Sequence, residues 1–451
     1  MRNTSYCWSQ LISPTLSIIL VASMPQKPVL IIGAGVVGLT LAHGLKNAGI
    51  PFIVFERDAH ISARHQGWAI TFHWCLPFLR QLVSPSALAS LEAAQVDPEC
   101  GSTNKFVFLN LATLEPKFNT PPTAERWRVN RGKFRRALLD GVAEHVHWNK
   151  HLTGIEMRDQ DHPDLVGGVV ASFSDGMTFE GRLIIGAEGS DSRTREYVAP
   201  GAHLNTRLPV RLMGATVSLT AVQATSIRAI DPLLFQGCHP DTRDFIYASI
   251  LDTPASNGSR ERGKDAETYG WQLMMSHFSE TVVDTQKKLK IETNSDDDKE
   301  ELSENAERLA DVKRRAENFH PVLRDVILAI PDSTEVHEII VQDWLPTHAW
   351  NNHGGRVTLS GDAAHAMTMY RGEAANHGIL DAYKLCEALK KVDSREREWT
   401  LGHAVSEYEA EMRERTSAAV LLSRQACLDA HDFASLNEDS AVLKRRAVRQ
   451  G

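Results

Sequence analysis

Cysteine is scarce in this sequence of 451 residues, and its cysteines are widely separated. None belongs to a Cys-x-x-Cys pair or clusters with histidine at metal-ligand spacing; the six are Cys7, Cys75, Cys100, Cys238, Cys386 and Cys427. Such scattering argues against a disulfide framework and against a zinc site, because both need cysteines at close, regular spacings. We therefore expect reduced thiols in a cytoplasmic protein, and no metal.

Long basic runs are also missing, and the formal net charge is −8. Nucleic acids and anionic membranes bind patches of lysine and arginine, so we expect neither as a partner. With 42% hydrophobic and 24% charged residues, the chain has the composition of a globular protein of two or three domains. A small-molecule enzyme is the class that this composition favours.

No hydrophobic run is long enough to cross a bilayer as a helix. The apolar stretch LSIILVA, residues 16–22, is too short for that. It resembles the core of a signal peptide, whereas the segment from Met24 onward has the pattern of a nucleotide-binding start. We interpret residues 1–26 as a dispensable N-terminal lead. Targeting or membrane association through residues 1–23 is the alternative.

The first motif is a glycine-rich loop inside a βαβ unit. Two apolar runs flanking a helical pattern predict this unit at residues 28–32, 36–47 and 52–55. The loop carries GxGxxG, formed by Gly33, Gly35 and Gly38. These glycines allow a tight turn, the approach of a pyrophosphate, and packing of helix on strand. Glu56 ends the second strand and can accept both hydroxyls of a ribose. The motif predicts a dinucleotide but does not separate NAD from FAD.

Two further stretches place charged residues near strand ends. RWRVNRGKFRRALLDGV, residues 126–142, sets Arg131 at a helix start, where its guanidinium could reach a cofactor. The alternative is a basic helix surface that also includes Arg128, Lys133, Arg135 and Arg136.

LIIGAEGSDSRTR, residues 183–195, is a buried strand that ends in an acid-glycine pair followed by S-x-x-R. That combination is unusual for a generic sheet.

The last stretch of this kind along the chain is RVTLSGDAAHAMTMYRGEAANHGILDA, residues 356–382. It predicts a strand, a Gly-Asp break at Asp362, a polar loop, and a helix that begins near Ala374. Ligands of parallel α/β sheets bind at the carboxyl ends of strands, so we expect Asp362 at a binding site. The helix start would add backbone N–H donors and partial positive charge.

Taken in order, GxGxxG, the Arg131 stretch, GAEGSDSRTR and Gly361-Asp362 resemble FAD-dependent monooxygenases of the para-hydroxybenzoate hydroxylase and salicylate hydroxylase kind. The resemblance extends from residue 28 to about residue 430. It implies that Glu56 binds the ribose of the ADP half, Asp362 the ribityl chain, and Ala375 the isoalloxazine. The cofactor-binding residues that it implies are Gly33, Gly35, Gly38, Glu56, Ala69, Arg131, Asp362 and Ala375.

Two positions depart from the pattern of this family. Glu188 stands where an aspartate is usual, which affects the expected contact with NADPH. In RHQGWAITF, residues 64–72, which the resemblance places beside the flavin, Ala69 replaces a common glycine. The form MTMYRGEAANH is similar to fungal members of secondary metabolism.

The resemblance implies an α/β fold in which a Rossmann-type FAD-binding domain is interleaved with a mixed β-sheet substrate domain and followed by C-terminal helices. The expected segments are 27–197 for the first part of the FAD-binding domain, with substrate-domain strands inserted near 70–120, then 198–345 for the substrate domain, 346–395 for the return to the FAD-binding domain, and 396–451 for the C-terminal helices.

The resemblance also implies the reaction: NAD(P)H reduces FAD, O₂ adds, and a flavin hydroperoxide hydroxylates or epoxidises an aromatic or electron-rich small molecule. Alternatives are an oxidase, dehydrogenase or halogenase on the same scaffold, or a non-catalytic FAD-binding protein. The W-x-W-x-I signature of flavin halogenases is absent, which disfavours that branch.

Catalytic side chains are harder to assign. Arg211 and Tyr247 lie in predicted strands of the substrate domain, where either could donate a proton or anchor substrate. The alternative for each is an ordinary position in a sheet. We interpret His365 as a structural residue of its turn and leave His377 and Arg371 unassigned. Of two charged stretches elsewhere, 291–319 is expected to form a solvated loop and exposed helix, and 401–431 a long amphipathic helix.

Overall fold

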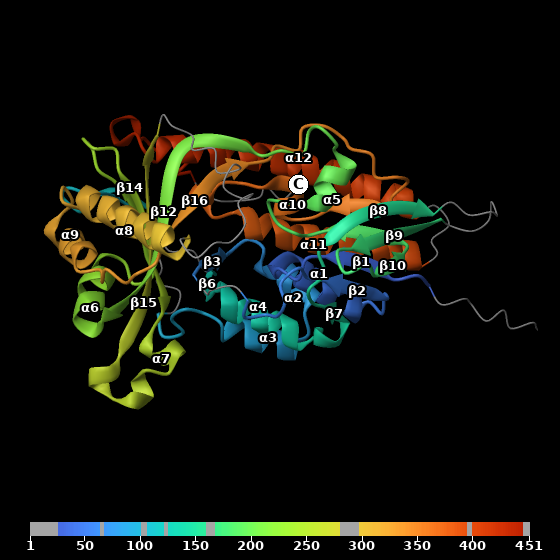
Figure 1. Ribbon diagram of the computed structural model, residues 1–451, viewed down its shortest axis with the longest axis horizontal. Coiled ribbons are helices and arrows are strands. Elements are labelled where there is room, and N and C mark those ends of the chain that lie inside the picture. The colour runs from blue at the N-terminus through green and yellow to red at the C-terminus, as the bar shows by residue number, and fades with distance from the viewer. Residues whose placement is uncertain are drawn as a thin grey trace, which may run out of the picture.

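The computed structural model describes residues 26–63, 67–100, 106–120, 125–158, 167–279, 297–394 and 399–444. Nearly all of the expected N-terminal lead therefore lies outside the described residues. Figure 1 shows two halves side by side, each built around its own sheet, and α12 (Leu401–Asp429) passes along both. In the part of the chain that the structure describes, no helix combines the length and the apolar character needed to cross a membrane.

The first half contains a five-stranded sheet in which every neighbouring pair is parallel. Its strand order is β17 (Val357–Leu359), β11 (Leu183–Gly186), β1 (Val29–Ile32), β2 (Phe52–Phe55) and β7 (Val146–His147). The strands β1, β11 and β17 are buried along their whole length, as expected of a parallel sheet covered on both faces. Although β17 comes late in the chain, it pairs directly with β11.

Helices and a small sheet cover the two faces of this parallel sheet (Figure 1). One face carries α1 (Val36–Asn47), α2 (Leu76–Leu82), α3 (Pro85–Glu92), α4 (Arg131–Asp140) and α11 (Ala374–Asp393). The other carries α5 (Arg193–Val198) and an antiparallel sheet of β10 (Thr178–Gly181), β9 (Gly168–Phe173) and β8 (Leu152–Arg158).

The second half is a seven-stranded mixed sheet. Its order is β16 (Val336–Asp343), β12 (Thr206–Thr220), β15 (Thr268–Phe278), β14 (Phe245–Asp252), β13 (Leu234–Cys238), β4 (Phe106–Asn110) and β5 (Pro116–Thr120). β4 pairs in parallel with β13 and the other neighbours are antiparallel. The chain thus leaves the first half twice to build this sheet.

Alternation along these strands supplies the second sheet with two apolar faces. In β4, Val107 and Leu109 face one core, while Phe106 and Phe108 face the other. The first core is closed by α6 (Ala221–Ile230), α8 (Asp297–Ala316) and α9 (Pro321–Leu328). The second core is closed by the end of α12 and by residues that follow it.

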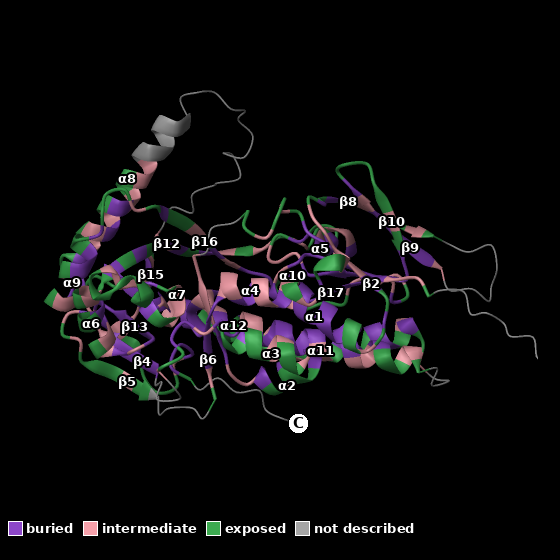
Figure 2. Cartoon of the chain, turned by 90° about the horizontal axis from the view of Figure 1, so that it is seen from below, coloured by how far each residue is buried: buried purple, intermediate pink, exposed green. Residues whose placement is uncertain are grey.

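The structure corrects one expectation for this half. The stretch 291–319 was expected to form a solvated loop and an exposed helix. Residues 297–316 do form the helix α8, but it is not exposed all round, because Leu309, Val312 and Ala316 are buried against the sheet. Figure 2 shows buried, intermediate and exposed residues along this helix. The expectation was wrong because the apolar face of α8 is narrow within a highly charged sequence, and the sheet that covers it comes from distant segments. Residues 280–296 lie outside the described residues.

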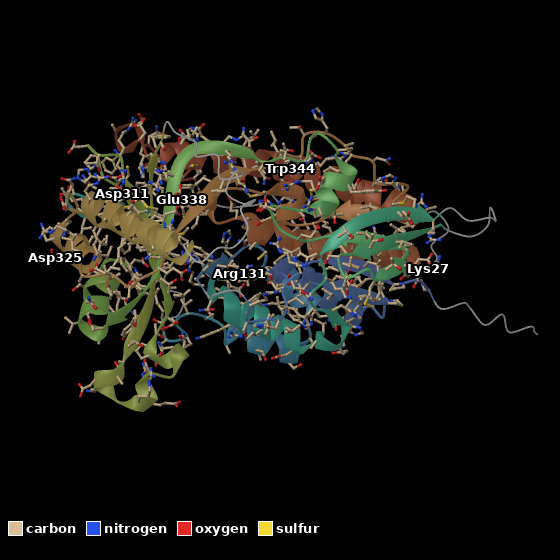
Figure 3. All side chains as sticks on the ribbon, viewed as in Figure 1. Lys27, Arg131, Asp311, Asp325, Glu338 and Trp344 are labelled. Carbon is tan, nitrogen blue, oxygen red and sulfur yellow. The ribbon has the colours of Figure 1, made fainter. Side chains whose placement is uncertain are left out.

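A two-stranded ribbon joins the halves. It consists of β3 (Ala69–Phe72) and β6 (Trp127–Asn130), which are antiparallel. Both strands contact β14 of the second sheet, and β3 also contacts α11. Figure 3 places Arg131, which follows β6, at the junction between the halves, with Lys27 and Asp325 toward opposite ends of the molecule. The remaining short helices include α7 (Pro254–Asn257) and α10 (Asp362–His365).

Candidate active site

A cavity of about 810 Å³ lies where the two halves meet. Its wall includes the glycine loop, the ribbon β3–β6, the loop after β17, the start of α11, and strands β13 to β15. Most of the residues singled out in the sequence line it, namely Gly33, Gly35, Glu56, Ala69, Arg131, Tyr247, Asp362 and Ala375. The tertiary structure therefore brings together segments more than three hundred positions apart.

The glycine loop has the geometry that a pyrophosphate needs. Gly33 has φ of +111°, and a Cβ there would lie 2.4 Å from the carbonyl oxygen of Ala187. A Cβ on Gly38 would lie 2.0 Å from the carbonyl oxygen of Gly33. A Cβ on Gly35 would meet nothing within 4 Å, and Gly35 lines the cavity. Gly33 and Gly38 are thus required by packing, whereas Gly35 leaves room for a ligand above the start of α1.

Glu56 is fixed in place at the nucleotide end of the cavity. Its Oε2 accepts hydrogen bonds from Ala34 N at 2.9 Å and Arg135 Nη2 at 3.1 Å, and its Oε1 from Asp58 N at 3.1 Å. Arg135 also donates to the carbonyl oxygen of Ala34 at 2.7 Å. These contacts fix the carboxylate at the end of β2, and Glu56 lines the cavity where a ribose would lie. Arg135 is buried, which contradicts the alternative of a basic helix surface at this position.

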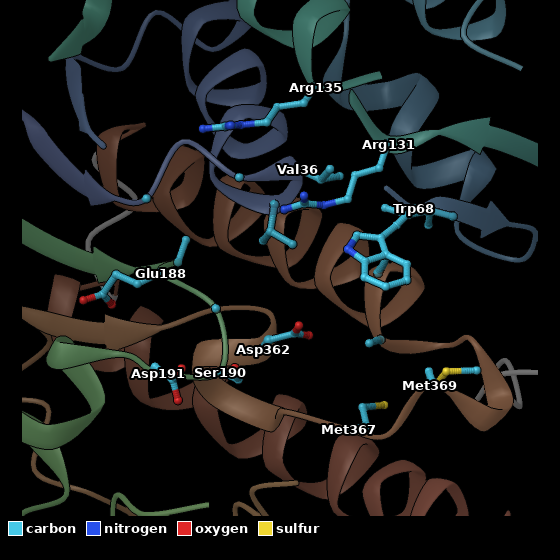
Figure 4. A pocket seen from close by; sticks show the side chains of 18 of the residues that line it. Val36, Trp68, Arg131, Arg135, Glu188, Ser190, Asp191, Asp362, Met367 and Met369 are labelled. Atoms are coloured by element: carbon cyan, nitrogen blue, oxygen red, sulfur yellow. The ribbon is translucent and has the colours of Figure 1, made fainter. Parts of the chain in front are cut away.

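Arg131 and Asp362 approach from opposite walls of the cavity (Figure 4). Arg131 is the first residue of α4, and the preceding Asn130 caps that helix through Gly132 N at 3.0 Å and Lys133 N at 3.1 Å. Enclosure by protein raises the pKa of Asp362, while the positive charges of His365 and Arg131 act in the opposite direction. Arg131 therefore supplies a positive charge, and Asp362 a hydrogen-bond acceptor, for the middle part of a bound dinucleotide.

A buried network holds the Asp362 loop from behind. Asp381 Oδ2 accepts from Gly361 N at 2.8 Å and lies 2.6 Å from His365 Nε2. Asp381 Oδ1 accepts from Arg415 Nη2 at 2.8 Å, and Arg415 Nη1 lies 2.9 Å from His377 Nδ1. Burial raises the pKa of Asp381, but the charges of His365 and Arg415 outweigh it and hold that pKa far below its usual range. His365 therefore has the carboxylate partner that the sequence did not reveal.

The segment that follows β11, which begins with the acid-glycine pair, also contacts the loop that carries Asp362. Glu188 accepts from Ser192 Oγ at 2.5 Å and from Arg193 N and Thr194 N at 3.1 Å each, so its carboxylate binds the start of α5. Arg195 donates to the carbonyl oxygens of Asp362 and Ala363, both at 3.4 Å. The longer side chain of Glu188 is thus turned toward α5 (Figure 4).

The expected flavin end is built from β3 and the start of α11. Ala69 N donates to Gln272 Oε1 at 3.1 Å, which ties β3 to the second sheet. Asn376 Nδ2 donates to Thr71 O at 2.9 Å, which ties α11 to β3. The residue before α11 makes no side-chain cap, so the first N–H groups of the helix, including that of Ala375, are available at the cavity.

The two candidate catalytic residues occupy different places. Tyr247 lines the cavity on β14. Arg211 does not line it: the guanidinium forms a two-point ion pair with Glu338 on the neighbouring strand, at 3.1 and 3.0 Å. This position, outside the cavity wall and paired with Glu338, does not support a catalytic role for Arg211. Arg371 reaches the cavity wall but is buried, where it pairs with Glu373 at 2.6 Å and donates to the carbonyl oxygen of Ala441.

Sequence reasoning missed several cavity residues of the second half. Gln236 comes from β13, and Gln272 and Met274 both come from β15. Arg128 comes from strand β6 of the ribbon, and Arg126 directly precedes that strand. The available signal was the spacing of Arg126 and Arg128, because alternate residues of a strand face the same side. The polar strand residues could not be assigned, since the sequence does not show which face of the sheet meets the cofactor domain.

Known proteins match the chain along most of its length. The model described as an NAD(P)-binding Rossmann-like domain matches residues 31–75, and that of an FAD binding domain matches residues 329–423. FAD-dependent monooxygenase dbaB of Emericella nidulans is 40% identical over 363 residues, which cover 80% of this chain and 86% of the relative. The chain belongs to the FAD-dependent monooxygenases. Thus the enzyme class and FAD as cofactor, predicted from four motifs, are confirmed.

Two further matches support the family and the fold. FAD-dependent monooxygenase phnB of Penicillium herquei is 32% identical over 426 residues, covering 93% of this chain and 95% of the relative. The structure of 2,6-dihydroxypyridine-3-hydroxylase from Arthrobacter nicotinovorans matches with a TM-score of 0.65 and 17% identity, over 94% of this chain and 99% of that one. The latter likeness concerns the fold, and it confirms the interleaved α/β architecture of this monooxygenase.

The cavity suits the cofactor of this family. Glu56, Arg131 and Asp362 supply polar groups along it, and Gly35 leaves the space that a pyrophosphate occupies. Within the described ranges, no group of three or more histidine, cysteine, aspartate or glutamate residues could hold a metal ion. The five cysteines in those ranges are free thiols.

Proposed function

We propose that this monooxygenase uses NAD(P)H and O₂ to insert one oxygen atom into an aromatic or electron-rich alkene carbon of a small molecule. NAD(P)H supplies two electrons, one atom of O₂ enters the substrate, and the other leaves as water. The supporting observation is a single cavity that joins the dinucleotide end at Gly35 and Glu56 to a chamber under β13, β14 and β15. A cofactor and a small substrate can meet inside it.

The residues have distinct tasks in this proposal. Bound FAD supplies the redox chemistry, accepting electrons from the nicotinamide and activating O₂. Glu56 and Arg131 would hold its nucleotide and phosphate portions, and Asp362 its ribityl hydroxyls. The free N–H groups at the start of α11 would stabilise negative charge near Ala375. Tyr247, on the chamber wall, is our candidate for substrate anchoring or proton donation.

We further propose that the substrate is an intermediate of fungal secondary metabolism and that the reaction takes place in the cytoplasm. The relatives dbaB and phnB come from fungi, and the loop MTMYRGEAANH is of the form associated above with fungal members. The scattered cysteines favour a reducing compartment.

The function is tested with purified holoenzyme under labelled oxygen. We expect a yellow protein that consumes NADPH or NADH faster when phenolic candidates are added, and a product that carries one labelled oxygen atom by mass spectrometry. Stoichiometric hydrogen peroxide without a labelled product would instead support the oxidase alternative. A colourless protein that binds no added FAD would refute the proposal, because every step of it depends on bound FAD.

A further inference from the structure

Two arginines line the chamber that the proposed function assigns to substrate. Arg126 and Arg128 lie at alternate positions, the first just before β6 and the second within it, and both line the cavity. Arg128 is only 3% exposed. A buried guanidinium loses its hydration, and this loss is costly unless a negative charge lies close by.

Among the residues that the structure describes, Arg128 has no such negative partner. Its Nε and Nη2 donate to Ser249 Oγ at 3.2 and 2.7 Å, and its Nη1 donates to Thr71 Oγ1 at 2.9 Å. Its guanidinium carbon lies 5.5 Å from the ring centroid of Tyr247. Hydroxyls and an aromatic ring fix the direction of the group, but they do not balance its full positive charge.

Arg126 is still less satisfied. Its Nε and Nη2 are enclosed and have no hydrogen-bond partner in the described part of the chain. The carboxylate of Asp231 favours the charged form of Arg126, but its Oδ1 accepts from Leu233 N and Leu234 N, both at 3.0 Å. Across the described residues, no ion pair joins Arg126 or Arg128 to a carboxylate. Loss of water lowers the pKa of both guanidinium groups.

Apart from Asp231, which acts on Arg126, the described residues of the chamber add no negative charge beside the two arginines. Gln236, Gln272 and Met274 are uncharged neighbours on its wall. The acidic side chains that line the cavity are all elsewhere, on the loops that follow β2, β11 and the return strand β17: Glu56, Glu188, Asp191 and Asp362. Of these, Glu56 binds Arg135 and Glu188 binds α5. The chamber therefore carries a net positive charge that points to an anionic ligand.

We infer that Arg126 and Arg128 form a subsite for an ionised oxygen of the substrate, either a carboxylate or an acidic phenol or enol. This inference rests on the proposed function, because it takes the chamber as the place of the substrate. Arg126 provides the donors that lack a partner among the described residues. Arg128, held by Ser249 and Thr71, provides a fixed positive charge over the ring of Tyr247. The subsite selects acidic substrates and orients them by their charged end.

The test compares anions with neutral molecules of the same shape. Holoenzyme is titrated with benzoate against benzamide, and with pentafluorophenolate against pentafluoroanisole, and binding is read from the flavin absorbance change. We expect each anion to bind at least about tenfold more tightly than its neutral counterpart, since hydrogen bonds to charged groups contribute most to binding. Preference in only one of the two pairs identifies that oxyanion as the source.

Variants assign the preference to the two arginines. In Arg126→Gln and Arg128→Gln, each still carrying FAD, we expect anion binding to weaken roughly 10- to 100-fold while neutral binding stays unchanged. Arg128→Lys keeps the positive charge, so it should retain part of the preference for anions. It provides a readout even if Arg128→Gln does not fold. Arg260→Gln is the matched control, because Arg260 is exposed and paired with Glu99 outside the cavity.

Several results would overturn the inference. These are equal binding of anion and neutral molecule by the wild type, full preference in both glutamine variants, or no response to either anion at millimolar concentration. An equally large rise in the KM for NADPH in the variants would assign the arginines to the reductant's phosphate instead. If labelled oxygen enters a product although anions are not preferred, the proposed function stands and the subsite fails. An anion preference without oxygen transfer would support the subsite and refute the proposed function.

Discussion

Three glycines of one loop have three different tasks. The loop is tight at Gly33, where φ is positive, and at Gly38, where the backbone of the helix meets the carbonyl of Gly33. Gly35 has φ of −76°, which any residue can adopt, and open space beside it. The absence of a side chain at Gly35 is therefore a matter of ligand access and not of folding.

A matched pair of substitutions separates these tasks. Gly38→Ala places a methyl group 2.0 Å from a backbone oxygen, so we expect a loss of about 3 kcal/mol or more in unfolding free energy. Gly35→Ala should change the stability of the FAD-free protein by less than about 1 kcal/mol. It should nevertheless weaken FAD binding about tenfold or more, because its methyl group enters the pyrophosphate position.

Urea unfolding of FAD-free protein and fluorescence titration with FAD measure the two effects. Wild-type FAD affinity in Gly35→Ala, or wild-type stability in Gly38→Ala, would contradict this division of tasks.

Among the elements, α12 connects the two halves through its C-terminal end. His431, directly after the helix, is fully buried, with Nδ1 2.7 Å from Cys427 O and Nε2 2.9 Å from Ser276 Oγ on β15. Ser276 Oγ in turn accepts from the Tyr370 hydroxyl at 2.9 Å. Since Nδ1 donates to a carbonyl, Nε2 accepts from Ser276, and the imidazole must be neutral for this chain of hydrogen bonds to form.

Acidification should therefore destabilise this junction. Burial lowers the pKa of His431 from 6.5 to about 4, and His277 and Arg243 act in the same direction, whereas the hydrogen bond to Cys427 O and the charge of Asp244 act against it. Because the folded-state pKa is lowered, this stability is complete above pH 6.5 and is lost as the pH falls toward 4, by up to about 3 kcal/mol.

The variant His431→Gln should lose less unfolding free energy than the wild type over that pH window, measured by urea unfolding. His337→Gln, at an exposed histidine, should keep the wild-type acid sensitivity. An unchanged pH dependence in His431→Gln would show that this imidazole does not contribute.

On the scale of the whole molecule, the cofactor cavity belongs to neither half alone. Its nucleotide end is formed by the loops of the parallel sheet, and its chamber by β13, β14 and β15. A ligand that fills the cavity contacts both, so its binding free energy should stabilise both.

Removing FAD should consequently lower the stability of both halves. At a free FAD concentration of one hundred times its Kd, we expect about 2.7 kcal/mol of added stability. Riboflavin at the same concentration should give much less, because it lacks the half that meets Gly35 and Glu56. Thermal melting measures the gain, and hydrogen exchange should slow in β1 and in β15. Protection confined to β1 would contradict a shared cavity.

The sequence by itself determined the elements whose signals are local. β1, α1 and β2 follow from short-range periodicity and glycines, and Arg131, Asp362 and α11 from motifs with fixed spacing. Periodicity and motif spacing predict these elements because their backbone conformation and burial depend mainly on residues close by in the sequence. The family and its cofactor were accessible from the sequence for the same reason.

Only the tertiary structure decided which side chains meet. Asp381 contacts His365 and Arg415, α8 buries one face on a distant sheet, and Arg211 pairs with Glu338. Arg126 and Arg128 line the chamber without forming an ion pair among the described residues. Each of these outcomes depends on pairing between strands and helices that are remote in sequence. A strand alone shows which residues share a face, and only the packed sheets show what that face contacts.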